Sequence, residues 1–180
     1  MATKSENSKF LTDVQTIRER ARKDIENGPV TEGYKGNRET ILNLLSQALA
    51  TELLCVLRYR QHYFTAKGMN SEEVAAEFLA HSNEEQAHAD KLAARIAQLH
   101  GNPDMDPRTI SGRSHAEYVE CETLEDMIRE NLVAERIAID SYLEMIHFIG
   151  DSDPTTRRML EEILAVEEEH ADDLVNLLQG

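Results

Sequence analysis

The sequence predicts an all-α fold, a four-helix bundle with one long crossover between helices two and three and a short helix before the bundle. Three observations support this prediction. Apolar residues recur every three or four positions along four long stretches, which is the period of one helix face. Alanine, leucine, glutamate and arginine abound while aromatic residues make up only 5%, a composition that favours helix. A connection rich in proline and glycine separates the second stretch from the third.

The chain has 180 residues and a formal net charge of −15. This length suits one domain with a substantial core. Because DNA and anionic membranes are polyanions, the charge argues against both as partners and suits a protein that attracts cations. No run of 18 apolar residues and no apolar signal segment occurs, so we expect a cytoplasmic location.

We divide the chain into residues 1–36, a tail with a short amphipathic helix, and residues 37–180, the bundle. In the first part, helical spacing continues up to Gly28-Pro29, where the helix should end. The apolar positions of this helix are Phe10, Val14, Ile17, Ala21 and Ile25. We expect it to be a packing or assembly element without chemistry of its own.

The first bundle helix is predicted over about residues 37–66, with a stop at Gly68. Its apolar stripe is interrupted by Glu52 and continues through Cys55 and Tyr59. A carboxylate on a buried stripe is costly unless something compensates its charge. Glu52 therefore needs an explanation that a glutamate on a solvated face would not need.

The second helix is predicted to start after Ser71 as N-cap and to lie antiparallel to the first, because the link between them is short. Its stripe carries Glu85 and His88 at core positions, with His81 one turn earlier. We interpret His81 as a core residue or a neighbour of the ligands. Three polar residues are expected to turn away from the core: Glu84, Gln86 and Asp90.

The connection over residues 101–120 is long for a compact domain. A crossover along the length of the bundle would explain it and would set helices two and three parallel. The third helix then carries Glu135 and Tyr142 on its core stripe and ends at Gly150.

The fourth helix is predicted to begin with Asp153 as N-cap and Pro154 as its first residue. Its stripe carries Glu167 and His170, whereas the two glutamates between them are expected to be solvated. We interpret four further histidines as surface or structural residues: His62, His100, His115 and His147.

The two halves of the bundle repeat one spacing of acidic and imidazole groups. Each half supplies a lone glutamate and, 32 or 33 residues later, a Glu-x-x-His motif, whose two side chains share one helix face. Seven residues after each lone glutamate stands a tyrosine, Tyr59 or Tyr142, which we expect beside the ligands. This is the ligand pattern of di-iron carboxylate bundles. The predicted metal ligands and catalytic residues are Glu52, Glu85, His88, Glu135, Glu167 and His170.

Four carboxylates and two neutral imidazoles would balance the charge of two divalent ions. Oxygen and imidazole ligands suit iron or manganese, and zinc can compete. We expect about two iron ions per subunit, bridged by Glu85 and Glu167, with Glu52 and Glu135 as terminal ligands. Each histidine would bind one ion. Two Fe(II) ions can each give one electron to O₂ or hydrogen peroxide, so that no free radical leaves the site.

Over residues 37–178 the chain resembles the ferritin superfamily, and within it the bacterioferritin and Dps-like (thioferritin) branches. The six-residue set matches the bacterioferritin ferroxidase centre residue by residue, and Tyr59 matches a tyrosine beside that centre. The resemblance implies oxidation of Fe(II) and storage of ferric mineral inside a hollow homo-oligomeric shell, with protection against oxidative stress.

Three features bear on which branch the chain resembles. Bacterioferritins bind haem through a methionine at the position of Gln86, so we expect no haem here. Their shells of twenty-four subunits carry a fifth helix, and only ten residues follow His170, which favours a dodecamer. Thioferritins have a cysteine pair near the metal site. Cys55 and Cys121 resemble that redox pair, with two packing residues as the alternative.

Other functions stay open at this point. The main alternative is a di-iron or dimanganese enzyme, such as a peroxidase or a catalase, that stores no mineral. A nucleoid-binding protein that only sequesters iron conflicts with the acidic charge. A bundle without metal would leave the buried carboxylates unexplained. Assembly into a shell together with iron loading separates these hypotheses.

Overall fold

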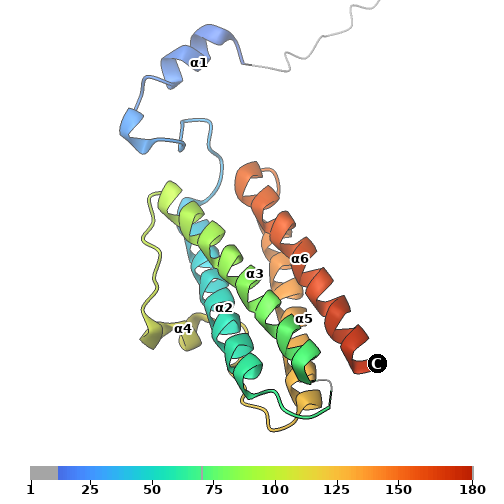
Figure 1. The fold of residues 1–180 in the computed structure, drawn as a ribbon. Helices are drawn as coiled ribbons and strands as arrows, with labels where there is room; N and C mark the ends of the chain where they lie inside the picture. The colour runs from blue at the N-terminus through green and yellow to red at the C-terminus, as the bar shows by residue number, and fades with distance from the viewer. Residues whose placement is uncertain (1–11, 70, 180) are drawn as a thin grey trace, which may run out of the picture. The chain divides into compact units, whose positions relative to one another are not determined.

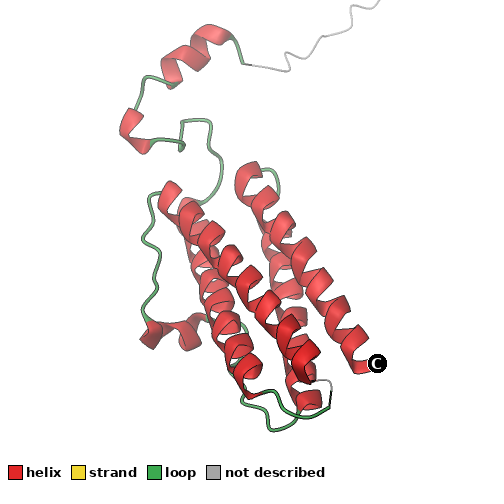
Figure 2. Ribbon diagram, viewed as in Figure 1, coloured by secondary structure: helices red, strands yellow, loops and turns green. Residues whose placement is uncertain are grey.

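The computed structural model describes residues 12–69 and 71–179 of the chain. These residues contain helices and loops but no strand, as Figure 2 shows. The predicted all-α fold with four long helices is confirmed. The bundle consists of α2 (Arg38–Thr65), α3 (Ser71–Gln98), α5 (Leu124–Ile149) and α6 (Pro154–Gln179). The shorter helices are α1 (Val14–Arg20), the 3₁₀ helix η1 (Ile25–Asn27) and α4 (Pro107–Arg113).

Contacts divide the chain into two compact units between Lys35 and Gly36. In the first unit the predicted amphipathic helix is shorter than expected. α1 starts after its cap Asp13, whose carboxylate accepts from the backbone of Gln15, and ends at Arg20. Asp24 then adopts a left-handed conformation with φ of 46°, which interrupts the helix before η1. Phe10, the first apolar position of the predicted helix, lies outside the described residues. The division into a tail with a short helix up to residue 36 and a metal-binding bundle after it stays a prediction.

α2 is the helix around which the second unit packs. Asn37 caps it by accepting from the backbone N–H of Thr40 at 3.1 Å. By length and composition alone α2 could cross a membrane, with a mean hydropathy of 1.6 over its most apolar window. However, 56% of that window is buried inside the structure, and Glu52 and Arg58 are buried on the same helix. Such burial is that of a core helix packed against other helices.

The crossover sets α3 and α5 parallel, as predicted, because it runs back along the length of the bundle (Figure 1). α2 packs mainly against α3, and α5 mainly against α6. The crossover also contains α4, which the sequence did not predict. Arg113 at its end donates to the backbone oxygen of Ser46 at 2.7 Å, and the His115 N–H donates to Thr51 Oγ1 at 3.0 Å. These contacts fasten the crossover to α2.

The ends of α5 and α6 follow the predicted signals. Gly150 follows α5 with φ of 49°, a conformation that favours glycine. The Asp153 carboxylate accepts from the backbone N–H of Thr156 at 2.9 Å, and Pro154 is the first residue of α6. Asp153 also binds buried Arg95 on α3 at 2.9 Å, so one side chain both caps α6 and ties it to α3.

Candidate metal centre

The six predicted ligands meet in the interior of the bundle. α2 supplies Glu52, α3 supplies Glu85 and His88, α5 supplies Glu135, and α6 supplies the last two. Their exposed fractions are all 2% or less: Glu52, Glu85, His88, Glu135, Glu167 and His170. Each lies on the core stripe of its helix, so the helical period that buries the apolar residues also brings these polar groups together.

The ligand atoms form two overlapping groups, within each of which they lie within 4.8 Å of one another. Glu85 and Glu167 belong to both groups, which is the position that bridging ligands between two ions would take. The first group contains Glu52, Glu85, His88 and Glu167. The second contains Glu85, Glu135, Glu167 and His170.

Both imidazoles point their Nδ1 atoms into the centre. His88 Nδ1 lies 2.9 Å from Glu167 Oε1 and 3.4 Å from Glu52 Oε2. His170 Nδ1 lies 3.7 Å from Glu85 Oε1 and 3.8 Å from Glu135 Oε1. Six of the atoms aimed inward are buried without a hydrogen-bond partner among the described residues: Glu52 Oε2, Glu85 Oε1, Glu167 Oε1, Glu167 Oε2, His88 Nδ1 and His170 Nδ1.

Glu84 corrects one detail of the sequence analysis, which expected it to turn away. Glu84 is an exposed residue. Its Oε2 nevertheless lies 2.6 Å from His170 Nε2, across the interface between α3 and α6. An acceptor at Nε2 favours the tautomer with a proton there and leaves the Nδ1 lone pair free to bind a metal. No sequence signal indicated this contact, because Glu84 and His170 lie 86 positions apart.

The two tyrosines connect the halves of the bundle. The Tyr59 hydroxyl donates to Glu135 Oε1, and the Tyr142 hydroxyl donates to Glu52 Oε1. Each tyrosine therefore holds the lone glutamate of the opposite half. The Tyr142 bond leaves Glu52 Oε2 for the centre, and both bonds fix the orientation of a carboxylate, which is how outer residues tune a metal ligand.

Burial and the neighbouring charges shift the pKa values of several groups in the centre. Burial, followed by the charge of Glu167, raises the pKa of Glu85 and Glu135 well above the usual range. Burial also opposes charge on Glu167, but contacts with His170 and His88 lower its pKa to about 2. Burial disfavours the charged form of His88, yet contacts with Glu167 and Glu52 raise its pKa to about 11. Of these carboxyl groups, Glu85 and Glu135 therefore favour the protonated form and Glu167 the ionised form.

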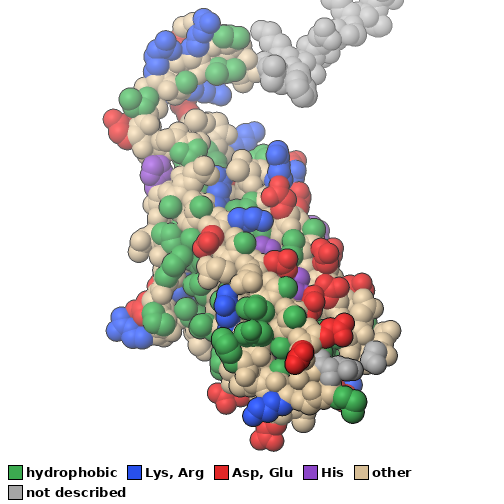
Figure 3. All heavy atoms as spheres, in the orientation of Figure 1, with side chains coloured by type: hydrophobic (Ala, Val, Ile, Leu, Met, Phe, Trp, Pro, Cys, Tyr) green, Lys and Arg blue, Asp and Glu red, His purple; other side chains and the backbone are tan. Residues whose placement is uncertain are grey.

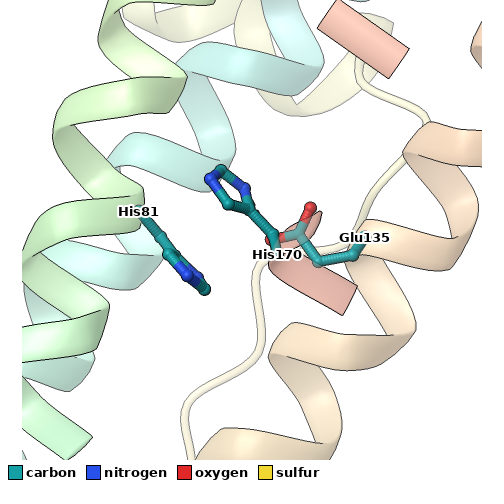
Figure 4. A group of neighbouring side chains, drawn as sticks. All are labelled: His81, Glu135 and His170. Carbon is teal, nitrogen blue, oxygen red and sulfur yellow. Dashed lines mark ion pairs between the residues drawn. The ribbon is translucent and has the colours of Figure 1, made fainter. Parts of the chain in front are cut away.

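His81 lies beside the centre, in agreement with its interpretation as a core residue or a neighbour of the ligands. Its ring stacks on that of His170 with centroids 4.0 Å apart, and Figure 4 shows the two rings with Glu135 beyond them. His81 Nδ1 lies 3.2 Å from the Tyr59 hydroxyl. Burial, followed by the charge of His170, lowers the pKa of His81 to about 3.

Both cysteines are free thiols in this structure. Cys55 is buried, and its burial followed by the charge of Glu85 raises its pKa well above the usual range. Cys121 is half-buried and packs against the same apolar cluster that contains Cys55. The pairing itself stays a prediction.

The chain is similar in sequence to a known family and to known proteins. The family model described as "Ferritin-like domain" matches residues 42–180. The bacterioferritin of Rhodobacter capsulatus is 29% identical over 138 residues, which cover 74% of this chain and 80% of that protein. The "DNA protection during starvation protein" of Pyrococcus furiosus is 29% identical over 150 residues, 79% of this chain and 78% of its own.

Solved structures give the same fold. The dodecameric thioferritin of Bacteroides fragilis superposes with a TM-score of 0.78 at 31% identity, covering 81% of this chain and 88% of that one. The Dps of Thermosynechococcus elongatus gives a TM-score of 0.75 at 20% identity, covering 78% and 90%, and shows likeness of fold alone.

Proposed function

Because the chain belongs to the ferritin-like family, we propose that it oxidises Fe(II) at the six-residue centre and stores the ferric product inside a homo-oligomeric shell. The observation that carries this proposal is the pair of ligand groups that share Glu85 and Glu167. An arrangement with two shared carboxylates suits two adjacent ions better than one. The buried atoms without hydrogen-bond partners support it, since unpartnered polar groups in a core are costly.

The donor set fits iron. Its four carboxylates offset the charge of two divalent ions, and its two imidazoles add nitrogen ligands of the kind that Fe(II) accepts. Manganese and zinc can occupy such a set as substitutes. Fe(II) is the substrate in this proposal, at about two ions per subunit. No haem is part of it, because Gln86 stands where bacterioferritins have the methionine that binds haem.

Two Fe(II) ions are needed at one site, because each ion gives one electron and the reduction of either oxidant takes two. Two Fe(II) ions give two electrons, which reduce O₂ to hydrogen peroxide with two protons or reduce hydrogen peroxide to two water molecules with two protons. The protein residues keep both ions in one buried place. Tyr59 and Tyr142 fix the terminal carboxylates, and Glu84 orients the ring of His170. Both oxidants are included in the proposal, with protection against oxidative stress as the consequence of consuming them.

The proposed assembly is a shell of twelve subunits, by analogy with the dodecameric thioferritin of Bacteroides fragilis. A cytoplasmic location is part of the proposal, and the net charge of −15 argues against DNA and anionic membranes as partners.

Measuring molecular mass in solution together with metal content tests the storage proposal. The protein should elute at the mass of a shell, and after aerobic addition of Fe(II) it should retain far more iron than the site can hold. A protein that stays a small oligomer and retains only site-bound metal would instead be a peroxidase or catalase-type enzyme.

A further inference from the structure

A second set of metal-ligand groups lies between α3 and α6, outside the six-residue centre. Glu77, His81 and Asp173 place their ligand atoms within 4.8 Å of one another. The two carboxylates are partly exposed, at 39% and 43% of their side chains, whereas His81 is buried with 1% of its surface exposed. Figure 3 shows acidic side chains gathered over the face that α3 and α6 form.

The hydrogen bonds around His81 determine which ring nitrogen faces this set. The Tyr59 hydroxyl donates its proton to Glu135, and the tautomer consistent with this bond has His81 Nδ1, 3.2 Å from that hydroxyl, as the donor between them. A neutral His81 ring then has its lone pair on Nε2. That atom is buried without a hydrogen-bond partner and lies 3.2 Å from Glu77 Oε1 and 3.8 Å from Asp173 Oδ2.

One oxygen of each carboxylate therefore faces the unpartnered His81 nitrogen, and the three ligand atoms lie within 4.8 Å of one another. The carboxylates and the nitrogen lone pair repel one another unless a cation lies between them. Donors bound to one ion at about 2.1 Å lie roughly 3.0–3.5 Å apart, so the Glu77 distance already fits and the Asp173 side chain needs only a small rotation. Two carboxylates and one imidazole are ligands for a divalent transition ion, with the exposed side left to water.

We propose that Glu77, His81 and Asp173 form a further divalent-cation site on each subunit, through which Fe(II) passes on its way to the buried centre. His81 links the two places, because its ligand atoms also lie within 4.8 Å of those of Glu135 and His170. Figure 4 shows these three side chains reaching toward one another from α3, α5 and α6. The transit role rests on the proposed ferroxidase function, whereas the existence of the site does not.

Anaerobic equilibrium dialysis of the apoprotein against Co(II), with metal analysis, tests the site. Wild type should bind about three ions per subunit, two in the centre and one outside it. The double variant Glu77→Gln, Asp173→Asn should bind one ion fewer. Both substituted side chains are partly exposed, so the fold should tolerate the change. Asp172→Asn, an exposed neighbour on the same helix, should leave the count unchanged.

Equal counts in wild type and the double variant would overturn the site and would mean that a proton on His81 compensates the two carboxylates. Glu85→Ala separates this failure from failure of the centre, because it should reduce the count by removing central ions while the outer ion remains. The transit role predicts that the double variant oxidises low concentrations of Fe(II) about ten-fold more slowly than Asp172→Asn. Equal rates would overturn the transit role.

Discussion

Glu85 and Glu167 are the two carboxylates that both ligand groups share, and they lie at the point where α3 meets α6. With exposed fractions of 1% and 0%, neither has water to compensate its charge. Contacts with two imidazoles lower the pKa of Glu167, while burial raises the pKa of Glu85. Two neighbouring carboxylates with opposite pKa shifts are typical of a functional site.

Removing either shared carboxylate should abolish rapid oxidation. Glu85→Ala and Glu167→Ala should each slow Fe(II) oxidation by more than about 100-fold, beyond the 10–100-fold effect of losing an outer partner, because each would remove a ligand from both ions. Stopped-flow absorbance after mixing with O₂ or hydrogen peroxide measures the rate. Glu168→Ala, an exposed glutamate one position along, is the matched control. Normal rates in both variants would contradict the assignment.

The cysteines permit a second test at this scale. If Cys55 and Cys121 form a redox pair, hydrogen peroxide should oxidise both thiols to one disulfide and be reduced to two water molecules. The number of free thiols per subunit should then fall to zero. The mass of the subunit should fall by that of two hydrogen atoms. Cys121→Ser is the control that cannot form the bond. Two thiols remaining in peroxide-treated, iron-loaded protein would make both residues packing groups.

The sequence analysis singled out polar residues on the buried stripes of the helices. It missed Glu84, which reaches the site from the exposed face of α3. The six predicted ligands and both tyrosines occupy stripe positions, where a polar group is conspicuous. Glu84 faces solvent by helical phase and reaches His170 only because α6 packs beside it. Spacing within one helix carries no information about such a contact between helices.

At the scale of the elements, local signals predicted the helix ends well. Gly150 and Asp153 occupy the expected end and cap positions, whereas Ser71, expected as an N-cap, is the first residue of α3. The N-terminal helix was predicted too long, because apolar spacing continues past Arg20 although Asp24 adopts a left-handed conformation. α4 was missed because seven residues are too few for a periodic pattern to emerge.

The contact between α3 and the start of α6 yields a stability prediction. Asp153→Ala should destabilise the protein by about 3–5 kcal/mol, because it leaves the buried Arg95 guanidinium without its carboxylate and removes the cap of α6. Urea unfolding at fixed protein concentration measures the change.

Asp151→Ala is the control for this change. Asp151 also pairs with an arginine, Arg157, at 2.6 Å, but its side chain is 96% exposed, so the change should cost less than about 1 kcal/mol. Equal shifts of the unfolding midpoint in the two variants would contradict the importance given to the Arg95 contact.

At the scale of the whole molecule, the bundle holds ionisable side chains in its interior, where burial without a partner is costly. Four helices bury four carboxylates and two imidazoles at their common centre, and the crossover lets α3 and α5 run parallel so that the two halves face each other (Figure 1). The centre itself is complete within one subunit, so its metal count can be measured directly.

Anaerobic titration of the apoprotein with Fe(II) tests the central claim most directly. Binding should saturate with a break at about two ions per subunit in a variant that lacks the outer Glu77 and Asp173 carboxylates. Glu85→Ala introduced into that same variant should abolish the break. A break at one ion, or a break that survives the loss of Glu85, would contradict a paired-iron centre built from these six residues.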